Sequence, residues 1–245
     1  MKSLLLTKIR LSWYFLFFFV GYFTLLAFLP RFKFEAAALT LFSVNSFLYG
    51  FYISPILSAQ KARIEELHKI VRAESNAIFT IMLATKNLKK PLRNRLQSKF
   101  SLYLTQNVHG LRSAAEKTYE SIIGFCLDYD GKEKEALDKL LEKIVANQQN
   151  RTNLNMQIAN RVYSNEWMIM MVLFSITLSF ILLLDTGSGL VLRVVTALLC
   201  TSLTMLVLIL VKLSTLTHKK AKQMWEPFKS LLATHYYRID KNTTD

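Results

Sequence analysis

Four long apolar segments dominate the pattern of hydrophobic and polar positions along the chain. They cover approximately residues 11–30, 36–57, 167–184 and 190–211. Each has 18 to 22 residues. A helix of that length, rising about 1.5 Å per residue, can cross the apolar core of a bilayer, which is about 30 Å thick. Because a backbone in lipid must satisfy its own hydrogen bonds, each segment predicts a transmembrane helix.

Short links join these segments in pairs. Residues 31–35 connect the first two and residues 185–189 connect the last two, which predicts two tight helical hairpins. Between the hairpins lies a polar stretch of 109 residues. The sequence therefore predicts an all-α protein with four parts along the chain: a first transmembrane hairpin, 1–57; a helical domain, 58–166; a second transmembrane hairpin, 167–211; and a basic amphipathic tail, 212–245.

Lysine and arginine are unevenly distributed over the two sides of this topology. The N-terminus, the inserted domain and the tail must share one side, and they hold 28 of the 31 basic residues, all but Arg31, Lys33 and Arg193. Basic residues close to membrane spans stay on the cytoplasmic side. We therefore expect the inserted domain and both termini to be cytoplasmic, in a protein of the cell inner (plasma) membrane.

Composition narrows the class further. The chain has 245 residues, 52% of them hydrophobic, and carries a formal net charge of +14. Only 7 Gly, 4 Pro and 2 Cys exclude collagen-like, disordered and disulfide-rich proteins. A basic excess can indicate nucleic-acid binding. Here the topology already predicts it, and attraction of juxtamembrane lysines to anionic lipid headgroups accounts for it, so the expected partner is the bilayer and not a nucleic acid.

The inserted domain has helical periodicity throughout. Apolar residues recur there at three- and four-residue steps, as at Ile70, Ala77 and Ile81. Pro91 fits the first turn of a new helix, and the sequence from Asp128 to Gly131 is typical of a turn. These signals predict a bundle of three long helices, at about 58–88, 91–126 and 132–163.

Two further signals lie beside the bundle. Pro55 indicates a kink or a boundary where the second span leaves the bilayer, and Ser164 with Asn165 indicates a break before the third span. In the tail, Trp225, Phe228, Leu231 and Leu232 form an apolar helical face. We expect this face to dock on the bundle or to lie at the membrane interface.

No catalytic, cofactor or metal motif is present in the sequence. The four histidines are far apart and have no metal-ligand spacing, and neither a phosphate-binding glycine loop nor a nucleophile elbow occurs. Cys126 is expected in the cytoplasm and Cys200 within a span, which excludes a disulfide between them. We therefore expect no enzymatic activity, no cofactor and no bound metal.

The second span is unusually polar and supplies the candidate pore-lining residues. Ser43, Ser46, Gly50 and Ser54 fall within about 80° of a helical wheel, and Asn45 lies on the opposite side. Two interpretations stay open for these residues. Small residues let helices pack closely, whereas hydroxyls and amides can replace water around a permeating ion.

Arg193 lies inside the fourth span, about one turn from its start. A charge within a membrane segment is a functional hypothesis by default, and here it could supply a positive field that attracts anions. Alternatively, Arg193 forms a structural pair with Asp185 across the hairpin, or its side chain extends to the membrane surface. Both interpretations stay open.

The layout and several short segments resemble a bestrophin-like family of bacterial multi-pass membrane proteins. The likeness begins at Leu48–Tyr52 and continues through Ala62–Leu83, where Glu74 stands in the acidic position of the pattern. It then passes Leu88–Arg93 and Tyr103 and resumes at Arg161–Trp167. The chain departs from the pattern where Asn107-Val-His109 replaces a Glu-Trp pair and where the tail around Trp225 replaces the usual ending.

The resemblance implies an oligomeric ring, a pentamer in such relatives, with a central anion pathway lined by the second span. The leading functional hypothesis is therefore a homo-oligomeric pore for small anions. The alternative is a membrane-anchored interaction or signalling protein whose helical bundle binds a cytoplasmic protein partner. A small-solute transporter is disfavoured because the two hairpins show no internal repeat.

Overall fold

The regular secondary structure of the described residues is helical, as the spacing of the apolar residues predicts. The computed structural model describes residues 10–185, 189–217 and 223–233. Over these ranges the protein is all-helical and contains no strand. The predicted all-α class is confirmed.

Four of the helices in the described part of the chain are long and apolar enough to cross a membrane. They are α2 (Leu11–Phe28), α3 (Ala36–Ala84), α8 (Ser164–Leu183) and α9 (Leu190–Ser214). Large apolar side chains cover their surfaces, and Phe28 and Phe17 are 82% and 72% exposed. Exposure of such large apolar surfaces to water is energetically unfavourable. The four helices are therefore of the kind found in integral membrane proteins.

Helix α3 extends well beyond the predicted end of the second span. Pro55, where the sequence indicates a kink or a boundary, lies inside α3, which continues to Ala84 through most of the helix expected at 58–88. A proline in a helix interior costs about 3 kcal/mol. The residues that follow it keep helical spacing and bury Ile64, Leu67 and Val71, and this packing stabilises the continuous helix.

The chain packs as two units. The first comprises Met1–Ile64 and Arg161–Ala221, and the second comprises Glu65–Asn160 and Lys222–Asp245. Packing thus changes partners at Ile64 and Asn160, a few residues inside the limits predicted for the inserted domain. Whether 58–166 marks the aqueous domain stays a prediction.

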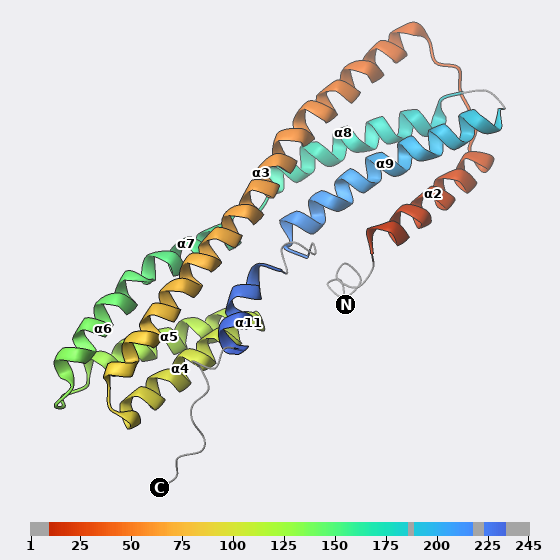
Figure 1. The fold of residues 1–245 in the computed structure, drawn as a ribbon. Coiled ribbons are helices and arrows are strands. Elements are labelled where there is room, and N and C mark those ends of the chain that lie inside the picture. The colour runs from red at the N-terminus through yellow and green to blue at the C-terminus, as the bar shows by residue number, and fades with distance from the viewer. Residues whose placement is uncertain (1–9, 186–188, 218–222, 234–245) are drawn as a thin grey trace. The chain divides into compact units, whose positions relative to one another are not determined.

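Within the first unit, α2 lies along α9, and α8 packs against α9 as well (Figure 1). The hydroxyls of Tyr22 and Thr204 are 2.7 Å apart and join α2 to α9. The principal packing partner of α2 is therefore α9 and not α3, the helix that follows α2 in sequence. Loop length alone could not reveal this pairing, because it depends on which side chains fit together.

A short backbone bridge ties the two links between the apolar helices together. The Phe32 amide donates to the carbonyl of Leu183 at 2.8 Å, and the Asp185 amide donates to the carbonyl of Phe32 at 3.0 Å. The link after α2 and the link after α8 therefore lie at the same end of the first unit. The predicted topology requires this arrangement.

One apolar cluster in the first unit joins α3, α8 and α9, the last through Leu210. Tyr49 and Ile53 of α3 are buried with Met170 and Phe174 of α8. Nearer the links, the Phe180 ring stacks on Phe34 and Phe42, with centroid distances of 4.2 and 4.5 Å. Such close side-chain fit is what holds helices together in lipid, where there is little hydrophobic driving force between them.

The second unit contains the later part of α3 and a set of shorter helices. These are η1 (Thr85–Asn87), α4 (Lys90–Val108), α5 (Arg112–Leu127), α6 (Lys134–Ala146), α7 (Gln148–Ala159), η2 (Gln223–Trp225) and α11 (Glu226–Ala233). Pro91 lies in the first turn of α4, as predicted.

The expectation of long helices at 91–126 and 132–163 is wrong, because each is broken once. The first break falls at Gly110, whose φ of +76° favours glycine and ends a helix. The second falls at Asn147, which separates α6 from α7. The Asn147 side chain donates a hydrogen bond to the Tyr119 hydroxyl and accepts one from the Asn150 amide. Side-chain hydrogen bonds of this kind compete with the regular helical pattern and favour a helix end.

The break before the third span also lies earlier than predicted. Helix α7 ends at Ala159, and α8 already begins at Ser164. The carboxylate of Glu166 accepts the backbone N–H of Tyr163 at 3.0 Å, which caps the start of α8. Ser164 and Asn165 therefore lie in the first turn of the helix.

The apolar face of the tail docks on the helical bundle, one of the two positions expected for it. Helix α11 packs against α4, and Phe228 is fully buried there. The Ser75 hydroxyl of α3 donates to the carbonyl of Pro227 at 3.4 Å. Residues 218–222 and 234–245 of the predicted tail lie outside the described residues.

Replacing Phe228 by Ala is expected to destabilise the second unit by about 3 kcal/mol, because it removes a fully buried ring and leaves a cavity. Thermal unfolding of the detergent-solubilised protein would measure this as a lowered midpoint. The exposed neighbour Lys229→Ala is the control and should leave the midpoint near that of the wild type. Equal midpoints for the two variants would contradict the docking of α11.

Candidate functional site

Three of the five pore-lining candidates lie on one exposed face of α3. We call this the outer face of α3 and define it by residues within about 100° of one another around the helix: Ser43, Phe47, Gly50, Phe51, Ser54 and Lys61, all exposed. The Ser43 hydroxyl donates to the Leu39 carbonyl at 3.0 Å, so it is satisfied within the helix. A side chain at Gly50 would meet no atom within 4 Å. Packing within this chain therefore does not require glycine there.

The other two candidates in this helix turn away from that face. The Asn45 amide donates to the Thr177 hydroxyl at 2.8 Å and to the Leu173 carbonyl at 3.2 Å, which ties α3 to α8. Ser46 is half-buried, and its hydroxyl has no hydrogen-bond partner among the described residues. The structure thus separates Asn45 and Ser46 from Ser43, Gly50 and Ser54.

Arg193 lies in the first turn of α9 and is half-buried. Its Nε is buried and makes no hydrogen bond to any residue in the described ranges. The backbone N–H of Asp185 takes part in the bridge to Phe32. The structural pair of Asp185 and Arg193 and the anion-attracting role of Arg193 both stay predictions.

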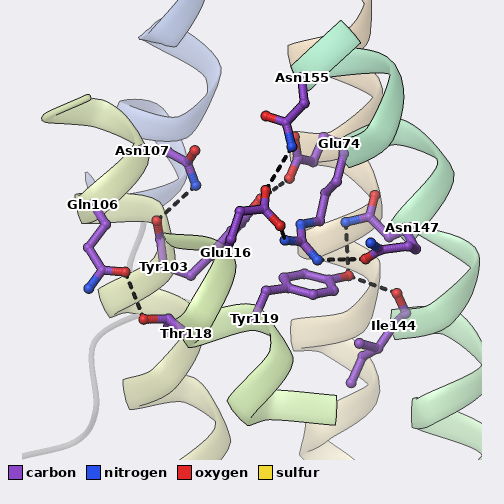
Figure 2. Close-up of polar contacts among 12 residues, drawn as sticks. Glu74, Tyr103, Gln106, Asn107, Glu116, Thr118, Tyr119, Ile144, Asn147 and Asn155 are labelled. Carbon is purple, nitrogen blue, oxygen red and sulfur yellow. Dashed lines mark hydrogen bonds and ion pairs between the residues drawn. The ribbon is translucent and has the colours of Figure 1, made fainter. Parts of the chain in front are cut away.

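The second unit contains a buried polar cluster that the search for motifs did not find. Its side chains come from α3, α4, α5, α7 and the residue between α6 and α7, and they converge in the interior of the bundle (Figure 2). We call this the buried polar cluster and define it as Glu74, Tyr103, Glu116, Tyr119, Asn147 and Arg151; all are buried except Glu116, whose side chain is 36% exposed.

Arg151 is the cation of the cluster and is only 2% exposed. Its guanidinium pairs with a carboxylate oxygen of Glu116 and donates to Oε1 of Gln148 at 2.6 Å. It also lies over the Tyr119 ring, 3.7 Å from the centroid. A planar guanidinium can stack on a ring and pair with a carboxylate at the same time, which a lysine cannot do. The second oxygen of Glu116 accepts from the Asn155 amide at 2.9 Å.

Tyr119 connects α5 to the junction of α6 and α7. Its hydroxyl donates to the Ile144 carbonyl at 2.7 Å and accepts from the Asn147 amide at 3.1 Å. Burial raises the pKa of Tyr119 to about 12, so the hydroxyl keeps its proton at any physiological pH. These two bonds satisfy polar groups that the end of α6 leaves inside the bundle.

Glu74 is a fully buried carboxyl group. The Tyr103 hydroxyl donates to its Oε1, while Oε2 has no hydrogen-bond partner in the part of the chain that the structure describes. Burial raises the pKa of Glu74 to about 7, and nearby Glu116 also raises it. The hydrogen bond from Tyr103 and the charge of Arg151 act in the opposite direction. Glu74 can therefore bind or release a proton near neutral pH.

The described residues include no group of three His, Cys, Asp or Glu side chains placed to hold a metal ion. Cys126 and Cys200 are buried and free. Burial raises the pKa of the Cys126 thiol to about 11, which keeps it protonated. The chemistry that the cluster offers is the binding of a proton at Glu74.

A periodicity signal for this cluster was present in the sequence. Glu74 lies on the same apolar stripe of α3 as the buried Val71 and Ile78. Arg151 lies on the stripe of α7 that contains Leu154 and Ile158, both buried. A charged residue at a position where helical periodicity expects an apolar one is a sign of a buried polar contact. In the sequence, Glu74 is singled out only by the family resemblance.

Comparison with known proteins adds no relative to this description. No protein-family model matches the chain, and neither a curated protein nor a solved structure does.

Exchanging Arg151 for Lys is expected to destabilise the second unit by about 2 kcal/mol, because an ammonium cannot both stack on Tyr119 and pair with Glu116. Chemical unfolding followed by circular dichroism would measure the loss. The same exchange at the exposed Arg72 of α3 provides the control and should change little. If Arg151→Lys were as stable as Arg72→Lys, the stacked geometry would not contribute to stability.

Proposed function

We propose that the chain is a homo-oligomeric multi-pass membrane protein in which the outer face of α3 from several copies lines a central pathway for small anions. The observation that carries the proposal is the exposure of Ser43, Gly50 and Ser54 on one face of an apolar helix. Lipid hydrocarbon is best matched by a continuous apolar surface. A stripe of small and hydroxyl-bearing residues is better matched by another helix or by water.

The glycine on this face supports the same conclusion. Glycine costs about 1 kcal/mol relative to alanine inside a helix. Nothing within this chain lies close enough to Gly50 to require it. A surrounding copy of the protein, or the width of a pathway, would account for a residue without a side chain at this position.

The charge at one end of the outer face favours anions over cations. Lys61 lies on this face two turns after Ser54 and is exposed. In a symmetric ring each copy would contribute one Lys61, and such a ring of positive charge attracts anions. Glu65 follows one turn later, exposed on the same side of the helix, so the preference for anions requires that Lys61 lie nearer the pathway than Glu65 does. In the same proposal Asn45 holds α3 against α8, and Arg193 adds positive charge near the opposite end of the membrane segment.

The finer topology belongs to this proposal as well. Two pairs of membrane helices flank a helical bundle on the cytoplasmic side, with both termini cytoplasmic, in the inner (plasma) membrane. The distribution of 28 of the 31 basic residues supports this orientation. The bridge between the two links supports their placement on one side of the membrane, whichever side that is. The resemblance to the bestrophin-like family accords with a ring of about five copies.

A rival function has its own supporting observation in the second unit. A groove of about 460 Å³ lies beside the start of α4. Its lining includes three basic side chains, two aromatic ones and one acidic one: Lys89, Arg95, Lys132, Phe125, Tyr129 and Glu133. Such a surface suits an acidic segment of a cytoplasmic protein partner. In this alternative the four spans anchor the bundle, and no ion passes through them.

Replacing Ser54 by Leu is expected to reduce halide efflux from proteoliposomes about tenfold while the size-exclusion profile stays unchanged, because a bulky apolar group narrows and dries the pathway. Ser175→Leu is the matched control, since Ser175 is exposed on α8. It should conduct as the wild type does.

Wild-type flux in both Ser54→Leu and Gly50→Leu would remove α3 from the pathway. If the wild type itself conducts no halide in vesicles of several lipid compositions, the rival function becomes the working hypothesis.

A further inference from the structure

We propose that Glu74 is a proton-binding site built into the bundle, and that loss of its proton loosens the packing of α3 against α4, α5 and α7. The proposal concerns the second unit alone and does not depend on whether the membrane helices conduct ions. The juxtaposition behind it is a fully buried carboxyl group beside a cation that is already paired with another carboxylate.

The surroundings of Glu74 favour its neutral form. The charged and titratable groups that face it are Tyr103 from α4, Glu116 and Tyr119 from α5, and Arg151 from α7. Arg151 makes its ion pair with Glu116, and no ion pair to Glu74 occurs in the described ranges. With both carboxylates ionised, two negative charges would share one guanidinium. With Glu74 protonated, the guanidinium of Arg151 serves Glu116 alone, whose side chain is 36% exposed.

The hydrogen bonds of Glu74 point in the same direction. Its Oε1 accepts the Tyr103 hydroxyl, but its Oε2 has no partner within the described residues. A buried carboxylate is stable when it accepts two or three hydrogen bonds, and this one accepts a single bond. Ionisation would therefore place an under-solvated charge between α3 and α4, and opening of the bundle to water would relieve it.

The direction of the pH effect follows from the pKa of Glu74, which burial raises from an ordinary value of 4.5 to about 7. The folded bundle binds this proton more tightly than the unfolded chain does. The stabilisation is therefore complete below about pH 4.5 and is lost as the pH rises through about 7.

Infrared spectroscopy of the full-length protein in detergent tests whether the proton is bound. Spectra recorded between about pH 5 and pH 9 should show the C=O band of a buried protonated carboxyl group. The intensity of this band should fall to half near pH 7. Glu74→Gln should lack this band. Glu120→Gln, at an exposed position of α5, is the control and should retain it. Absence of the band from the wild type at every pH would overturn the proposal.

A second variant separates proton binding from a purely structural role and does not require Glu74→Gln to fold. Tyr103→Phe removes the hydroxyl that stabilises the carboxylate form. It should therefore raise the midpoint of the band by about one pH unit. An unchanged or lowered midpoint would contradict the assignment of the band to Glu74.

Hydrogen–deuterium exchange tests the loosening. After correction for the intrinsic effect of pH, the amides of residues 67–82 in the wild type should exchange about tenfold faster above the midpoint than below it. Glu120→Gln should behave in the same way. A pH-independent corrected rate in the wild type would show that the proton binds without any effect on the packing, which would overturn the second half of the proposal.

Discussion

The structure depends first on one constraint, namely that the polar backbone of a strongly apolar chain must be satisfied without water. Helices α2, α3, α8 and α9 satisfy it within themselves, and their surfaces carry large exposed apolar side chains. Since lipid is as apolar as these side chains, burial alone does not select helix partners. Side-chain fit and a few polar contacts do so instead. The Tyr22–Thr204 contact joins α2 to α9, and the Asn45–Thr177 bond joins α3 to α8. The outer face of α3, where Ser43, Gly50 and Ser54 alternate with Phe47 and Phe51, is exposed and lies outside these contacts.

The second unit meets the opposite problem, because polar groups lie inside it. Most are satisfied in pairs: Arg151 with Glu116, and Tyr119 with Ile144 and Asn147. Two atoms of the cluster have no hydrogen-bond partner among the described residues, Nε of Arg151 and Oε2 of Glu74, and Glu74 accepts a single hydrogen bond, from Tyr103. The energetic cost of ionising it is shared by the helices that surround it. A single proton can therefore influence the packing of the whole bundle.

The sequence predicts the helices better than it predicts their contacts. The apolar segments begin at the predicted residues for α2, α3 and α9 and three residues early for α8, because length and hydropathy suffice to find them. The breaks at Gly110 and Asn147 were missed, since each depends on local conformation or on a side-chain bond to another helix. The continuation of α3 past Pro55 and the pairing of α2 with α9 depend on packing partners far away in sequence. For the same reason, the polar pattern of α3 places Asn45 on the opposite side of the helix but does not reveal that Ser46 is half-buried while Ser43, Gly50 and Ser54 are exposed.

The central claim is that the outer face of α3 meets further copies of the same chain. Four helices of which one is polar cannot enclose a wetted pathway alone, so a ring is required. The most direct test is the protein mass of the purified complex in mild detergent, measured by light scattering with correction for bound detergent. The account predicts a mass near five chains of 28.3 kDa each. A monomer or dimer in several mild detergents would contradict it.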